Sequence, residues 1–153
     1  MAVGPFHQAA FALQELITLA NEIERELARL LGLNLTDYRA LSALAAAGPV
    51  TIGTLAERLG TTPATTTAIV NRLETGGHVQ RERNAEDRRQ VGVRATTSGL
   101  GRIMGLMAPL MIATNDYIQS LPADEQRVVA DFLAAALGQM RDQLAAMSAL
   151  ESS

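Results

Sequence analysis

The chain of 153 residues is 48% hydrophobic and 19% charged, with no cysteine and a formal net charge of -3. This length and composition predict one folded domain, and the absence of cysteine excludes disulfides, thiolate metal sites and a cysteine nucleophile. No segment reaches the roughly 18 uninterrupted apolar residues of a membrane span. The first basic residue is Arg25, so the charged start of a signal peptide is missing and we expect a cytoplasmic protein without a membrane partner.

The first two elements are expected to be helices. Apolar residues recur at three- and four-residue steps over residues 8–31, which predicts one long amphipathic helix ending at Gly32. Thr36 is the expected N-cap of a second helix. The pair Gly48-Pro49 ends that helix, because glycine closes helices and proline cannot continue them.

Two shorter helices follow, separated by a tight break. Thr51 or Thr54 is expected to start the third helix, which ends at Gly60. After three residues, Thr62 offers an N-cap and Pro63 suits the first helical position, where its missing N–H has no partner in any case. Two helices joined in this way are typical of a helix-turn-helix.

The pattern then changes from a helical to an alternating period. Residues 78–83 predict a strand, residues 84–87 a turn, and residues 89–95 a returning strand, so we expect a β-hairpin. Helix-turn-helix units place their second helix in the major groove of DNA, and a hairpin directly after that helix would form a wing.

Two long helices complete the chain. Thr96 or Thr97 is expected to start a fifth helix, in which Pro109 predicts a kink, and a final helix follows Pro122. The predicted fold is therefore mainly α with a small β-hairpin wing. Its centre is a winged helix-turn-helix flanked by N- and C-terminal helices.

The fourth helix is the candidate recognition helix. If Thr66, Ile69, Val70 and Leu73 face inward, short polar and methyl-bearing side chains face outward, where they can contact base edges and phosphates. The alternative is that this threonine-rich turn is a capped solvent face. The residues expected to bind DNA are Thr62, Ala64, Thr65, Thr67, Ala68, Asn71 and Arg72.

The hairpin supplies the positive charge that a DNA-binding wing needs. Residues 50–102 carry eight arginines and five acids, whereas both flanking segments are acidic. Such a basic island is expected where only one face meets a polyanion. Alternatively, Glu82, Glu86 and Asp87 could neutralise the hairpin. Its arginines are Arg81, Arg83, Arg88, Arg89 and Arg94.

Two sequence blocks resemble the MarR family of winged helix-turn-helix regulators. NAEDRRQVGVRATTSG at residues 84–99 is similar to that family's wing, and TLAERLGTTPATTTAIVNRLETGGHVQR at residues 54–81 is similar to its helix-turn-helix. The resemblance covers essentially the whole chain. Ala68 stands where many relatives carry a basic or polar side chain, and Ala95 stands where the strand usually ends in leucine.

The resemblance implies a homodimer. Residues 1–35 and 100–150 would form the helical dimerisation region of a single MarR-like domain, and residues 36–99 its DNA-binding lobe. It further implies that Asp87 braces the wing by pairing with an arginine and that Arg89 enters the minor groove, so Arg81, Arg83, Asp87, Arg88 and Arg89 are the expected wing residues. Twofold symmetry predicts a roughly palindromic operator.

A small apolar or aromatic ligand is also expected. Met104, Met107 and Met111 lie close together around the predicted kink, and flexible thioethers adapt to varied apolar guests. With Tyr38 they are the candidate pocket, although methionines at helical spacing are also common core residues. The resemblance favours a repressor that the ligand releases from DNA.

Two readings of the function remain open. One is a ligand-responsive DNA-binding regulator; the other is a dimeric helical ligand-binding or interaction protein that has lost DNA binding. Nothing indicates an enzyme, since no nucleophile elbow, phosphate loop or ligand-spaced acid cluster is present. His7 and His78 form no recognisable metal motif, so we expect neither a metal nor a cofactor.

Overall fold

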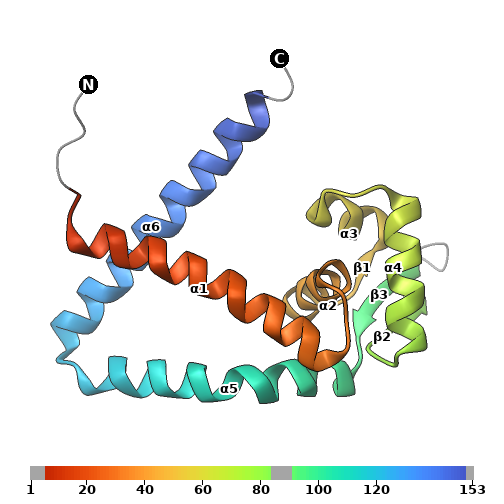
Figure 1. The fold of residues 1–153 in the computed structure, drawn as a ribbon, viewed down its shortest axis with the longest axis horizontal. Coiled ribbons are helices and arrows are strands. Elements are labelled where there is room, and N and C mark those ends of the chain that lie inside the picture. Colours follow the sequence, from red (N-terminus) through yellow and green to blue (C-terminus); the bar gives the residue numbers. More distant parts are fainter. Residues whose placement is uncertain (1–5, 84–90, 151–153) are drawn as a thin grey trace. The chain divides into compact units, whose positions relative to one another are not determined.

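The computed structural model describes residues 6–83 and 91–150. It is mainly helical with a small antiparallel sheet, which confirms the expected fold class (Figure 1). The chain divides into two compact units, Met1–Met107 and Ala108–Ser153. The elements are α1 (Gln8–Leu31), α2 (Leu35–Ala47), β1 (Val50–Thr51), α3 (Ile52–Leu59), α4 (Pro63–Thr75), β2 (Val79–Arg83), β3 (Val91–Ala95), α5 (Thr97–Ser120) and α6 (Ala123–Leu150).

Most helix starts follow the expected caps, with one correction. The side chain of Thr51 caps α3, and Thr62 caps α4 with Pro63 in its first turn. The cap predicted for α2 is wrong, because Asn34 and not Thr36 holds that position. The Asn34 Oδ1 atom accepts a 2.8 Å hydrogen bond from the backbone N–H of Asp37. An asparagine oxygen satisfies this orphan donor at least as well as a threonine hydroxyl.

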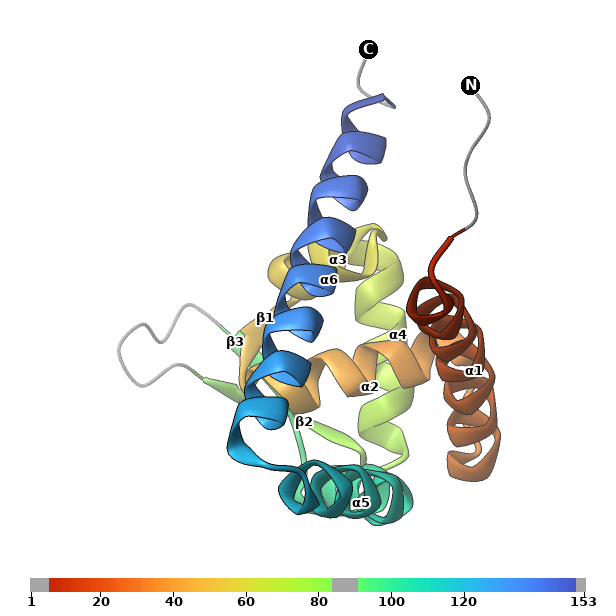
Figure 2. The ribbon, with the colours of Figure 1, turned by 90° about the vertical axis from the view of Figure 1, so that its left-hand side faces the viewer.

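The predicted hairpin is confirmed, and a third strand joins it. Strands β2 and β3 pair in register from Val79 opposite Ala95 to Arg83 opposite Val91. The two-residue strand β1 pairs with the other edge of β3, so the sheet order is β1-β3-β2. The expected turn at residues 84–87 lies outside the described residues. In Figure 2 the outer ends of β2 and β3 point away from α2 and α4.

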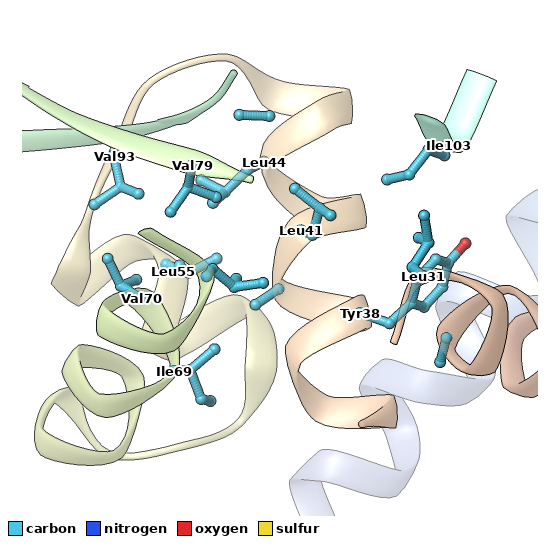
Figure 3. Packing of buried hydrophobic residues seen from close by; sticks show 14 of the residues in the cluster. Leu31, Tyr38, Leu41, Leu44, Leu55, Ile69, Val70, Val79, Val93 and Ile103 are labelled. Carbon is cyan, nitrogen blue, oxygen red and sulfur yellow. The ribbon is translucent and has the colours of Figure 1, made fainter. Parts of the chain in front are cut away.

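One hydrophobic core holds the first unit together (Figure 3). Leu41 and Leu44 of α2 and Leu55 of α3 are almost completely buried. Ile69, Val70 and Leu73 of α4 pack into the same cluster with Val79 and Val93 of the sheet. Leu31, Tyr38 and Ile103 lie together in Figure 3 at the side where α1, α2 and the start of α5 meet.

The start of α5 lies against the end of the helix-turn-helix. The Thr96 hydroxyl donates a 2.8 Å hydrogen bond to the Gly77 carbonyl and accepts one of 3.0 Å from the Gly99 N–H. Thr96 also donates its backbone N–H to the carbonyl of His78 at 2.9 Å. His78 is buried here, and burial, reinforced by the charge of Arg102, lowers the pKa of its imidazole.

Gly99 permits this close approach. A Cβ atom at residue 99 would lie 2.4 Å from the backbone oxygen of His78, which is too close for any side chain. Gly99 is therefore needed for α5 to pack against the residue that precedes β2. Gly101 differs, since a Cβ atom there would meet nothing within 4 Å.

The second unit is formed by the end of α5 and by α6. The helix α5 continues through Pro109 to Ser120, and the kink expected there stays a prediction. Of the 28 residues of α6, only Ala136 is buried. None of the helices in residues 6–83 and 91–150 combines the length and hydropathy needed to cross a membrane.

The two glycines at the start of α5 provide a matched test of the packing. Gly99→Ala should lower the free energy of unfolding by about 1–3 kcal/mol, because the methyl group must displace the backbone of His78. Gly101→Ala should leave stability unchanged or raise it by up to about 1 kcal/mol, the helix-propensity gain. Urea unfolding of both variants measures the difference, and equal stabilities would contradict the proposed constraint.

Candidate nucleic-acid interface

The turn between α3 and α4 is fixed by threonines. Gly60 ends α3 with a φ of 62°, a left-handed conformation that glycine adopts without strain. The hydroxyls of Thr61 and Thr66 are 2.7 Å apart, and Thr66 is fully buried. Thr62 accepts a 3.2 Å hydrogen bond from the N–H of Thr65. The threonine hydrogen bonds thus tie the turn residues Thr61 and Thr62 to the first turns of α4, which fixes where α4 begins.

The faces of α4 divide as the sequence predicts. Thr66, Ile69, Val70 and Leu73 are buried in the core. The residues expected to meet DNA are all exposed: Thr62, Ala64, Thr65, Thr67, Ala68, Asn71 and Arg72. Between Arg58 and Arg72 the chain has no charged residue. The first two turns of α4 therefore present an uncharged surface of small side chains.

Arg72 connects α4 to α2. Its Nη2 and Nε atoms donate to the two carboxylate oxygens of Asp37 at 2.6 and 2.9 Å. The Asp37 side chain is only 5% exposed, whereas that of Arg72 is 53% exposed. The hydrogen bonds to Asp37 raise the pKa of the Arg72 guanidinium. A buried carboxylate and a guanidinium that donates two hydrogen bonds to it form a directional contact that orients both helices.

Arg81 connects α4 to the hairpin. Its Nη1 atom pairs with Glu74, and its Nη2 atom donates a 2.6 Å hydrogen bond to the Asn71 Oδ1 atom. The backbone N–H of Arg81 also donates to Glu74, at 3.3 Å. Sequence analysis assigned Arg81 and Asn71 to DNA but missed this internal contact, in which the strand and the helix brace each other.

The hairpin arginines differ in their surroundings. Arg94 forms a 3.3 Å ion pair with Glu82. The alternative that acidic residues neutralise the hairpin therefore holds for this one arginine. Arg83 is exposed and has no ion pair within the described residues. Three predicted wing residues, Asp87, Arg88 and Arg89, lie outside the described residues, as does Glu86.

The residues of the expected ligand pocket lie in different surroundings. Tyr38 is buried and Met107 packs against the core, whereas Met104 and Met111 are 57% and 59% exposed. None of the four lines a pocket of about 370 Å³ in the first unit. That pocket lies between α1 and α5 and is lined by Leu30, Leu31, Gly101, Arg102, Gly105 and Leu106.

The described residues contain no group of His, Cys, Asp or Glu side chains that could hold a metal ion. The geometry instead has a short helix, a fixed turn, a second helix with one exposed face, and a basic hairpin braced against that helix. These features define a winged helix-turn-helix protein.

Comparison with known proteins gives the family. The MarR family model matches residues 31–90. The chain is 34% identical over 117 residues to the HTH-type transcriptional regulator YcgE of Bacillus subtilis (strain 168). The aligned region covers 76% of each chain. The chain therefore belongs to the MarR family of transcriptional regulators.

Solved structures share the fold. RV1404 from Mycobacterium tuberculosis superposes with a TM-score of 0.65 at 20% identity, covering 90% of this chain and 97% of that one. A mutant of S. aureus MepR bound to an oligodeoxyribonucleotide gives a TM-score of 0.56 at 17% identity, covering 88% and 99%. At these identities the likeness concerns the fold.

The Asp37–Arg72 pair can be tested by removing its buried partner. Asp37→Ala should lower the midpoint of thermal unfolding by about 2–6 °C, because two charge-assisted hydrogen bonds are lost while solvent screens the half-exposed arginine. Thr36→Ala, at the exposed neighbouring position, is the control and should leave the midpoint unchanged. Equal midpoints for both variants in calorimetry would show that the pair contributes nothing to stability.

Proposed function

We propose that this MarR-family protein is a dimeric regulator that binds double-stranded DNA in a sequence-specific manner. The observation that carries the proposal is the exposed, uncharged face of α4 beside an arginine-bearing hairpin. In this proposal residues 36–99 form the DNA-binding lobe. The segments 1–35 and 100–150 form the dimerisation region, and the protein acts in the cytoplasm.

The DNA contact is divided between the helix and the hairpin. The candidate residues of α4 would enter the major groove, where helices of this kind read base edges. The hairpin would supply phosphate and minor-groove contacts, with Arg83 exposed on the described part and Arg88 and Arg89 assigned from the sequence. The structural neighbour MepR, of which a mutant was solved bound to an oligodeoxyribonucleotide, supports DNA as the ligand by analogy of fold.

Exposed apolar side chains support the homodimer. In α1 only Leu27, Ala28 and Leu31 are buried, although the helix has 24 residues. Large hydrophobic side chains are 40% or more exposed on α1 (Phe11, Leu16, Leu19, Leu30) and on α6 (Val128, Phe132, Leu133, Leu137, Met140, Leu144, Met147, Leu150). A chain in water does not leave so many apolar residues uncovered without a partner, and a second copy supplies the matching surface.

A repressor released by a small aromatic acid is the regulatory part of the proposal. The pocket between α1 and α5 has apolar walls and one cation, Arg102, a combination that suits an aromatic ring with a carboxylate. Met104, Met107, Met111 and Tyr38, which do not line this pocket, remain the separate, sequence-based candidates for a ligand site. Titrating aromatic acids into the protein–DNA complex tests whether a ligand of this class weakens DNA binding.

The wing can be tested by its salt dependence. Arg89→Ala should weaken binding to duplex DNA and make the slope of log K against log salt shallower by about one unit for each bound copy of the chain. Arg141→Ala, an exposed arginine on α6, is the matched control and should change neither quantity. Fluorescence anisotropy at several salt concentrations measures both, and an unchanged slope would remove Arg89 from the contact.

If the intact protein binds no duplex at low salt, the DNA-binding proposal fails. The remaining interpretation would then be a helical ligand-binding or interaction protein that has lost DNA binding.

The dimer predicts a mass in solution of about twice the 16.3 kDa of one chain. Phe132→Glu should shift the protein toward monomers or aggregates, because a charge would be forced into the apolar interface. Gln139→Glu places the same charge at an exposed polar position on α6 and should leave the dimer intact. Sedimentation equilibrium distinguishes these outcomes, and a monomeric wild type would overturn the proposal.

A further inference from the structure

The reading face of α4 carries unusually little hydrogen-bonding capacity for a DNA-binding helix. Its first two turns expose Pro63, Ala64, Thr65, Thr67 and Ala68. None of these side chains is charged or long. Two of them end in a single methyl group, and the others offer only short groups, so base recognition here depends on close contact.

Part of this short hydrogen-bonding capacity is already used inside the protein. The Thr67 hydroxyl donates to the Pro63 carbonyl at 2.9 Å, and the Thr62 hydroxyl donates to the Thr65 hydroxyl at 2.9 Å. A hydroxyl has one proton to donate. Thr62 and Thr67 therefore have acceptor lone pairs and a methyl group left for a ligand.

Asn71 and Arg72, two longer polar residues of α4, also use part of their hydrogen-bonding capacity inside the protein. Arginine bonded to guanine and asparagine bonded to adenine are the strong pairings in the major groove. Arg72, however, directs Nε and Nη2 at the buried carboxylate of Asp37, and the Asn71 Oδ1 atom accepts a hydrogen bond from Arg81. Both side chains keep further donors, Arg72 at Nη1 and Asn71 at Nδ2, but these contacts fix where each side chain points.

The methyl groups of this face match one feature of the major groove. Thymine carries a C5-methyl group there, and alanine and threonine methyl groups make apolar contact with it. Ala64, Thr67 and Ala68 are spaced by three and four residues, so they lie on one side of the helix. Their small size allows the helix axis to approach the base edges closely.

We propose that Ala64, Thr67 and Ala68 determine operator sequence by contact with the 5-methyl groups of thymines. The proposal rests on the DNA binding proposed above. It names the chemical class of the target: duplex DNA with thymines at fixed positions in each half-site.

The test uses the full-length protein and the DNA that it selects from a random duplex pool. Each thymine of the selected site is replaced in turn by deoxyuridine, which removes the methyl group and leaves base pairing and the minor groove intact. Affinity should fall about fourfold at each contacted thymine, the factor for burying one methyl group. The same replacements in an unselected duplex should have no effect.

Rescue and a protein variant sharpen the result. Where thymine is replaced by cytosine, 5-methylcytosine should recover about fourfold relative to unmethylated cytosine. Thr67→Ser removes only a methyl group and should abolish the deoxyuridine effect at one position. Thr75→Ser is the matched control, because Thr75 is also exposed on α4 and donates its hydroxyl to a backbone carbonyl four residues earlier at 2.9 Å.

The outcomes distinguish a failure of methyl recognition from a failure of the proposed DNA-binding function. Selective binding with loss at deoxyuridine, and coupling of that loss to Thr67→Ser, supports methyl recognition. Selective binding that ignores deoxyuridine but falls when guanines are replaced by 7-deazaguanine overturns methyl recognition and leaves the DNA-binding function standing. Failure to select any DNA overturns the function itself.

Discussion

The bidentate pair between Asp37 and Arg72 is the contact on which the exposed surface of the lobe depends. α4 buries one apolar stripe against α2 and α3, and a stripe alone tolerates small rotations of a helix about its axis. A carboxylate that is almost fully buried and bonded at both oxygens does not tolerate them, because rotation would leave it without partners. The pair thus fixes which side chains of α4 face outward. Arg81 repeats the device on the other side of the helix by joining Glu74 and Asn71 to the hairpin.

These contacts show why net charge is a poor guide to the interface. The basic segment of residues 50–102 holds eight arginines, yet Arg72, Arg81 and Arg94 are paired with acids of the same chain. Their first effect is to position the helix and the strands. Positive charge for a polyanion must come from arginines that remain exposed without an acidic partner, as Arg83 does among the described residues.

Much of the fold could be predicted from the sequence because its signals are local. The caps at Thr51 and Thr62, the glycine at residue 60 and the change to alternating periodicity after residue 77 each act within a few residues, and the structure follows all of them. The strand β1 could not be predicted, since two residues show no periodicity and depend on the distant β3 for pairing. Asp37 was missed for the same reason: its partner is 35 residues away, and an acid in the first turn of a helix is usually a surface residue.

Thr96 has a mechanical consequence. β3 ends at Ala95 and α5 begins at Thr97, so a single residue joins them. That residue is bonded to Gly77 and His78, directly after α4, and to Gly99 within α5. This connection has no loop residues that could absorb a displacement, and a Cβ atom at Gly99 would overlap the backbone of His78. A rotation of the first turn of α5 therefore also displaces Gly77 and His78, and with them the end of α4 and the start of β2.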